Sequence, residues 1–327
     1  MLKCCRSPRF VYFYAFQNLP MNSILDIQKV YKQYGDYVAL NEVSLQVPKG
    51  SIYGLLGPNG AGKTSLIRII NQITLPDRGQ VILDGELLQP KHVQQIGYLP
   101  EERGLYKTMK VGEQCLYLAQ MKGLSKAEAK VQLEYWFDRL EIRGWWDKKI
   151  QELSKGMAQK IQFVVCVLHQ PKLLIFDEPF SGFDPVNANL IKDEILELKK
   201  KGSTIIFSTH RMESVEELCD DIALIHQSNK LLEGPLQEVK RQFRTHQYEV
   251  GILTDNTEKL QLELAKTFSM QPTQFKSLNN ELQLEIGLNN QTPNALLHLL
   301  TQHGQVTHFM EKIPSVNDIF IQTVQTN

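Results

Sequence analysis

The segment Gly57-Pro-Asn-Gly-Ala-Gly-Lys-Thr64 constrains the fold of this chain more than any other feature. It fits the pattern G-x-x-x-x-G-K-[ST] of a phosphate-binding loop. An apolar run over 51–56 precedes it and a helical pattern begins at Ser65, so the loop should join a buried strand to a helix. Its glycines let backbone N–H groups converge on phosphate oxygens, and the helix N-terminus adds its positive end. A chance glycine-rich turn would lack these flanks, so the pattern predicts nucleotide binding.

Two residues of this loop carry chemistry, and a second motif supplies carboxylates. Lys63 should reach the β- and γ-phosphates, and the Thr64 hydroxyl should ligate Mg²⁺. Leu173-Leu-Ile-Phe-Asp-Glu178 is an apolar strand that ends in two acids. Asp177 could hold the metal ion, and Glu178, pointing elsewhere, could polarise an attacking water. The plain alternative is a buried strand that ends in solvated acids.

Three further segments narrow the class of nucleotide-binding protein. Leu153-Ser-Lys-Gly-Met157 precedes a helical pattern from Ala158 to His169. Phe180-Ser-Gly-Phe-Asp-Pro185 is rich in turn residues and opens a helix. Ser203 to His210 is a β-rich run that ends in a histidine. A lone histidine usually has no catalytic or binding role, so His210 becomes a candidate site residue only because it follows the other motifs along the chain.

Taken in this order, the motifs resemble those of ATP-binding cassette (ABC) ATPases, and the resemblance covers roughly Ile24 to Gly234. It implies an α/β fold, the P-loop NTPase cassette with an antiparallel β subdomain and a helical subdomain. It also implies ATP and Mg²⁺ as cofactors. The residues that it places at the nucleotide are Tyr34, Gly57, Pro58, Asn59, Gly60, Ala61, Gly62, Lys63, Thr64, Ser65, Ser154, Gly156 and Asp177.

The same resemblance implies individual roles. The expected catalytic residues are Lys63, Glu178 and His210, and the expected metal ligands are Thr64, Glu101 and Asp177. Tyr34 would stack on adenine, while His210 would contact the γ-phosphate. Ser181 to Pro185 would contact a second ATP-binding subunit, and Ile96 to Glu101 would link the nucleotide to a membrane partner.

Two departures from the family pattern stand out. The usual signature is Leu-Ser-Gly-Gly-Gln, but here Lys155 replaces the first Gly and Met157 replaces Gln. Ser154 and Gly156 remain, with the hydroxyl and backbone donors expected to touch the γ-phosphate. Glu101 stands where most members have Gln. Together with the segment 102–106, these variants resemble the ATP-binding subunits of simple bacterial exporters, including the sodium-extrusion type.

Composition excludes several other classes of protein. The chain has 36 basic and 36 acidic residues, so no global positive field favours nucleic acid. No apolar run approaches the roughly 18 residues of a membrane helix. A membrane role must therefore come through a partner. The resemblance implies an integral membrane permease, which would hold this subunit on the cytoplasmic face of the bacterial inner membrane.

The pattern along the chain predicts three parts. Residues 1–20 precede the first cassette strand, and we expect an extension from a misplaced start or a disordered tail. Residues 21–235 should form the ATPase domain. Residues 236–327 show a β-α-β-β-α-β order, which predicts a small ferredoxin-like α+β domain, followed by a helix that Ser315 caps. This part contains no catalytic constellation, and its role stays open.

Two functions compete at this stage. The first is the ATPase motor of an exporter, in which two copies, expected as a homodimer, enclose two ATP molecules. Sodium or another small molecule would be the cargo. The second is a soluble regulator or nucleic-acid-associated clamp. Clamps of that kind carry long coiled coils or two cassettes, whereas this chain has one cassette and no sustained heptads. The exporter is therefore favoured.

Overall fold

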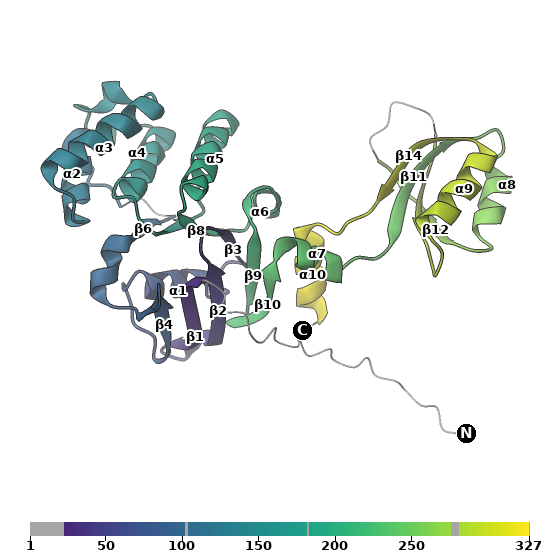
Figure 1. Ribbon diagram of the computed structural model, residues 1–327, viewed down its shortest axis with the longest axis horizontal. Helices are drawn as coiled ribbons and strands as arrows, with labels where there is room; N and C mark the ends of the chain where they lie inside the picture. Colours follow the sequence, from purple (N-terminus) through teal and green to yellow (C-terminus); the bar gives the residue numbers. More distant parts are fainter. Residues whose placement is uncertain (1–22, 102–103, 182, 276–280, 327) are drawn as a thin grey trace.

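The computed structural model describes residues 23–101, 104–181, 183–275 and 281–326 (Figure 1). The expected N-terminal extension, part of the segment 102–106 and Gly182 of the turn-rich loop lie outside the described residues. The described chain forms three sheets, of which two belong to the cassette and the third to the C-terminal part.

The central sheet has six strands in the order β10-β9-β3-β8-β7-β6. Its parallel members are β3 (Ile52–Leu56), β6 (Ile96–Leu99), β7 (Leu173–Asp177), β8 (Thr204–Thr209) and β9 (Asp221–His226). The edge strand β10 (Asn229–Pro235) runs antiparallel to β9. Every residue of β3 and β7 is buried, as continuous apolar runs in a sheet covered on both faces should be.

Alternate side chains of these strands enter two different cores. In β3, Tyr53 and Leu55 join one apolar cluster, whereas Ile52 and Leu56 join the other. The first cluster also contains helix α1 (Lys63–Ile70) and the sheet β2-β1-β4-β5. The strands of that antiparallel sheet are β1 (Ser23–Tyr34), β2 (Tyr37–Pro48), β4 (Arg78–Leu83) and β5 (Glu86–Leu87). The two-residue period of a strand thus fixes which subdomain each side chain supports.

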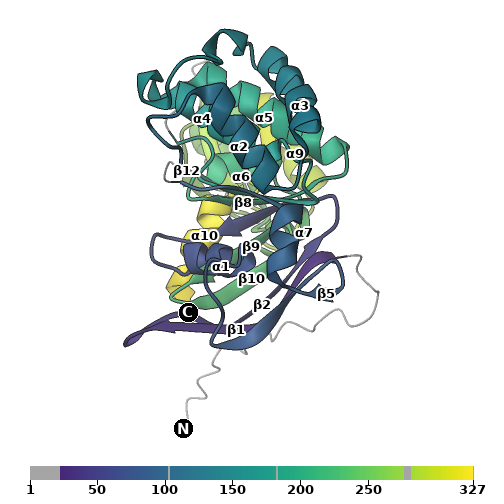
Figure 2. The ribbon, with the colours of Figure 1, turned by 90° about the vertical axis from the view of Figure 1, so that its left-hand side faces the viewer.

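Helices cover the opposite face of the central sheet. They are α2 (Val111–Met121), α3 (Lys126–Arg139), α4 (Lys155–Val167), α5 (Pro185–Lys200) and α6 (Met212–Leu218). Short 3₁₀ turns lie at Pro90–Gln95, Arg143–Trp145 and Ile150–Glu152. Figure 2 shows α1 below the central sheet and α2, α3 and α4 above it. Ser125 and Glu128 form a capping box at the start of α3.

Helix α4 begins three residues earlier than the sequence pattern predicts. The prediction placed the start at Ala158, but the helix starts at Lys155 because Ser154 caps it. The Ser154 hydroxyl accepts a hydrogen bond from the Met157 backbone N–H at 3.2 Å. The signature segment is therefore the first turn of this helix.

The C-terminal sheet has the order β12-β13-β11-β14, which confirms the ferredoxin-like prediction. Its elements are β11 (Gln247–Leu253), α8 (Thr257–Leu264), β12 (Ser269–Pro272), β13 (Leu282–Gly287), α9 (Pro293–His303) and β14 (Gln305–Glu311). These elements enclose a separate apolar core. The strand β12 ends at Pro272, and its Met270 packs against this core.

The remaining C-terminal helices pack on the cassette. Both α7 (Leu236–Gln242) and α10 (Val316–Thr326) contribute to the cassette cluster, α10 through Val316 and Ile319. The Val316 N–H donates to Glu216 of α6 at 2.6 Å, so α6 holds the start of α10. The separate domain is thus inserted between two helices of the cassette, as Figure 1 shows.

This packing predicts that α10 stabilises the cassette. Ile319 is 1% exposed, whereas Ile321 on the same helix is 43% exposed. We expect Ile319→Ala to lower the free energy of unfolding by about 2–5 kcal/mol, the usual cost of truncating a buried isoleucine. The matched Ile321→Ala should change it by less than about 0.5 kcal/mol. Urea denaturation of the two variants measures the difference, and equal midpoints would contradict the docking of α10.

Candidate nucleotide-binding site

The phosphate loop connects β3 to α1, and its conformation requires glycine. Gly57 and Gly62 have φ values of 147° and 114°. A Cβ atom on Gly57 would lie 2.1 Å from the Ile225 carbonyl oxygen, and one on Gly62 would lie 2.3 Å from the Ala39 carbonyl oxygen. Both contacts would be with backbone atoms, which cannot move aside as the end of a flexible side chain could. The loop is therefore pressed against both cassette sheets, with Asn59 and Gly60 exposed at its tip.

Lys63 lies folded over the loop. Its ammonium donates to the Gly57 carbonyl at 2.7 Å and to the Pro58 carbonyl at 3.1 Å, and the residue is 8% exposed. Burial lowers the pKa of Lys63, while the negative charges of Asp177, Glu178 and Glu101 oppose that shift. The cation is thus positioned where phosphate oxygens could replace carbonyl oxygens as its acceptors.

Carboxylates from two segments lie near this lysine, Glu101 after β6 and the pair Asp177 and Glu178 at the end of β7. Asp177 ends β7 and is 5% exposed. Burial raises its pKa, and the negative charges of Glu101 and Glu178 raise it further, against the lowering effects of Ser208 and Lys63. A cation bound there would offset the cost of burying the Asp177 carboxylate and its repulsion by Glu101 and Glu178.

Mg²⁺ prefers oxygen ligands, and the three residues expected to bind it supply oxygen atoms. Thr64 is exposed in the first turn of α1, and Asp177 and Glu101 supply carboxylates. Among the residues that the structure describes, no group of three or more histidine, cysteine and acidic side chains forms a complete protein metal site.

Glu178 points away from Asp177, toward the end of β8. Its backbone has a φ of 50°, a left-handed conformation that is unfavourable for a residue with a side chain. Its carboxylate accepts the His210 backbone N–H at 2.8 Å and lies 2.6 Å from the His210 Nδ1. The Thr209 hydroxyl also donates to it at 3.1 Å. The strained backbone and these three contacts fix the orientation of this carboxylate.

The hairpin between β1 and β2 brings Tyr37 to the phosphate loop and places Tyr34 opposite it across the turn. Tyr34 is 43% exposed, and the Lys32 ammonium lies 5.3 Å from its ring centre. Tyr37, paired with Tyr34 across the turn, donates its hydroxyl hydrogen to the Gly60 carbonyl at 2.5 Å. The sequence prediction missed Tyr37. Its only signal was the two-residue turn Gly35–Asp36, which places the two tyrosines opposite each other.

The signature residues lie on the other side of the central sheet. Ser154 caps α4 and Gly156 lies in its first turn, whereas Lys63 begins α1 below the sheet (Figure 2). The turn-rich loop after β7 lies beside the signature helix α4, because the Gln159 side-chain amide of α4 donates to the Ser181 carbonyl. Asp184 then caps α5 by accepting the Asn187 N–H at 3.0 Å. The structure thus brings together Lys63, Asp177, Glu178, Glu101 and His210, but not Ser154 and Gly156.

None of the helices in the described part of the chain is both long enough and apolar enough to span a membrane.

Comparisons with known protein families agree with this arrangement. The family model described as ABC transporter matches residues 40–181. A second model, described as the C-terminal domain of ATP-binding protein DrrA1-3-like, matches residues 234–324. The two models together cover the phosphate loop, the signature segment, the β7 carboxylates and the ferredoxin-like sheet.

Individual relatives cover most of the chain. The chain is 40% identical over 301 residues to the uncharacterized ABC transporter ATP-binding protein YhaQ of Bacillus subtilis, covering 92% of this chain and 98% of that protein. It is 37% identical over 219 residues to the Nod factor export ATP-binding protein I of Cupriavidus pinatubonensis, covering 65% and 67%. A solved structure of an ATP-binding subunit of an ABC transporter superposes with a TM-score of 0.64 at 32% identity, covering 68% of this chain and 93% of that one. The chain therefore belongs to the ABC transporter family, as an ATP-binding subunit with ATPase activity.

Proposed function

We propose that this protein is the ATP-hydrolysing motor of an exporter whose transport pathway is a separate membrane permease. The observation that carries the ATPase part is the pair Asp177 and Glu178, of which one is buried near Lys63 and the other is held at His210. The direction of transport rests on the similarity to a subunit named for Nod factor export. The cargo is sodium ions or another small molecule.

The binding of ATP follows from the loop. Backbone N–H groups of residues 57–65 and the Lys63 ammonium bind the phosphates, and Tyr34 stacks on the base. Thr64, Asp177 and Glu101 would hold Mg²⁺, which would neutralise phosphate charge. Since Lys63 already donates to carbonyl oxygens of the loop, phosphate binding requires only an exchange of acceptors.

Hydrolysis depends on a water positioned by Glu178. The Thr209 hydroxyl and the His210 backbone N–H hold the carboxylate in place, and its remaining lone pairs accept a proton from water. His210 is 61% exposed at its side chain, so its imidazole can also contact the γ-phosphate. The strain at Glu178 is the cost of turning this carboxylate away from the metal ligand Asp177.

A complete site requires two copies of the chain. Ser154 and Gly156 belong to a helix above the central sheet, while the phosphate loop lies below it. A homodimer arranged head to tail would bring these residues of one copy to the phosphates on the other. ATP-binding subunits of this family generally dimerise and work with a membrane permease.

The permease would contact the surface that follows Glu101. Tyr106, which precedes α2, and Tyr117 of α2 are 54% and 45% exposed, with ring centres 6.4 Å apart in an edge-to-face arrangement. Met121, on the same helix, is 62% exposed. Clustered exposed apolar side chains favour a protein interface, and Tyr106 follows the expected metal ligand Glu101 by five residues in the sequence. Docking there would place the subunit on the cytoplasmic face of the bacterial inner membrane.

Export by this subunit is tested in inside-out membrane vesicles that contain its permease. The parent protein should drive ATP-dependent uptake of the cargo, with sodium tested first. Glu178→Gln should retain ATP binding but lose more than about 99% of hydrolysis and transport, because the base that orients water is removed. This variant should also accumulate as an ATP-bound dimer in size-exclusion chromatography. Hydrolysis at the parent rate would remove Glu178 from its role, whereas hydrolysis without uptake would favour a soluble clamp.

The composite site is tested by mixing two inactive variants. Lys63→Ala damages the phosphate loop and Ser154→Arg damages the signature, so each homodimer should hydrolyse almost no ATP. In the mixed dimer, one site combines both defects and the other is intact. We expect the mixture to regain about a quarter of the parent rate per total chain, if half of the dimers are mixed and the sites act independently. A mixture no more active than its components would exclude a site shared between copies.

Tyr37 should set nucleotide affinity through its hydrogen bond to the phosphate loop. We expect Tyr37→Phe to weaken ATP binding about 2–10-fold, since a single hydrogen bond contributes roughly 0.5–1.5 kcal/mol. Tyr31→Phe is the matched control, because its hydroxyl donates to Gln33 at 2.9 Å on the same strand. Isothermal titration calorimetry with ATP compares the two. Equal Kd values for both variants would show that the contact with Gly60 does not matter.

A further inference from the structure

A cavity of about 570 Å³ lies at the end of the central sheet opposite to the phosphate loop. Its walls include Lys172 and Thr204, where β7 and β8 begin, whereas Asp177 and His210 lie at or just beyond the ends of these strands. The cavity is therefore separate from the candidate nucleotide site, and its volume is within the range of small-molecule sites.

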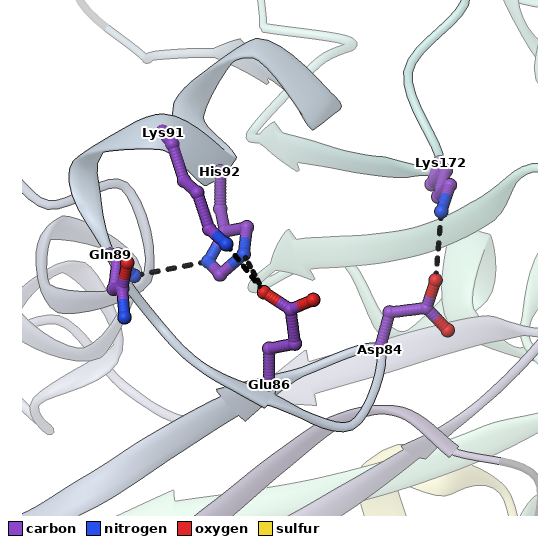
Figure 3. Close-up of polar contacts among 6 residues, drawn as sticks. All are labelled: Asp84, Glu86, Gln89, Lys91, His92 and Lys172. Carbon is purple, nitrogen blue, oxygen red and sulfur yellow. Dashed lines mark hydrogen bonds and ion pairs between the residues drawn. The ribbon is translucent and has the colours of Figure 1, made fainter.

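The charged groups in this wall are three lysines and one aspartate. Asp84 accepts hydrogen bonds from Lys49 at 2.6 Å and Lys172 at 2.8 Å, and these two bonds lower its pKa to about 2. Figure 3 shows Lys172 facing Asp84. The third lysine, Lys201, contacts the neutral Tyr135 hydroxyl at 3.2 Å and lies 5.3 Å from that ring centre. Positive charge thus exceeds negative charge here, although the whole chain is formally neutral.

A second cavity, of about 400 Å³, adjoins the first. The two share Gln132 and Gln170 as wall residues. The apolar residues of the second wall are Leu124, Ala127, Val131 and Leu168. Its two titratable residues do not add positive charge: burial lowers the pKa of His169 to about 4, and Glu128 accepts the Ser125 N–H in the cap of α3.

We propose that the two cavities form one binding site for a single-chain amphiphilic anion. The carboxylate or phosphate head lies among Lys49, Lys172 and Lys201, and the alkyl tail follows α3 past Val131. Charge-assisted hydrogen bonds hold the head, and contact with the apolar wall removes part of the tail from water. The volume suits one chain of a free fatty acid or alkyl phosphate rather than a two-chain lipid within a bilayer. This site is independent of the proposed export function.

The test is calorimetric titration of the full chain with decyl phosphate, below its micelle concentration. Inorganic phosphate and decanol serve as the head alone and the tail alone. We expect decyl phosphate to bind at least about 10-fold more tightly than either. Lys201→Gln and Val131→Glu should each weaken it by a similar factor. Lys130→Gln, an exposed change on α3 outside both walls, should have no effect, and unchanged ATP binding shows that each variant is folded.

Three outcomes would overturn the proposal. The first is equal affinity for inorganic phosphate and decyl phosphate, which would leave the tail cavity without a role. The second is equal binding by the Lys201→Gln and Lys130→Gln variants. The third is co-sedimentation with vesicles that contain dioleoyl phosphatidate, dependent on Lys201, with no binding of free decyl phosphate. That result would assign the lysines to a membrane surface.

Discussion

Close packing of the phosphate loop against backbone is the constraint on which the cassette depends. The Ile225 and Ala39 carbonyls approach Gly57 and Gly62 so closely that no side chain fits at either glycine. One carbonyl comes from the central sheet and the other from the antiparallel sheet, so the loop is fixed only when both are assembled. Burial of β3 on both faces supplies that assembly, because its alternate residues enter two different cores.

The same burial affects the charged side chains beside this loop. Lys63 and Asp177 are both almost inaccessible, and burial opposes the charged form of each. Their mutual attraction and the carbonyl acceptors of the loop offset part of that cost. The surplus of carboxylates beside a single lysine leaves the site suited to a cation together with phosphate, which matches the substrate of an ATPase.

The C-terminal part is connected to the cassette at both of its ends. Leu236 of α7 and Val316 of α10 enter the cassette core, and Glu216 of α6 contacts both Lys240 and the start of α10. Helix α6 follows directly after His210. Helix α6 is therefore the element that lies between His210 and the two helices that flank the ferredoxin-like sheet.

The sequence by itself determined the family, the order of the strands and helices, and the motif residues expected at the nucleotide. It could do so because the phosphate loop, the β7 acids and the strand periodicities are local patterns. Only the tertiary structure decided that Tyr37 reaches Gly60 and that α10 packs on the cassette. Each of these depends on contacts between residues that are far apart in the sequence. The pattern of a strand or helix shows which of its faces is apolar, but it does not show which element packs against that face. The Glu178 carboxylate is the same kind of case, since its direction is set by Thr209 and His210, more than 30 residues along the chain.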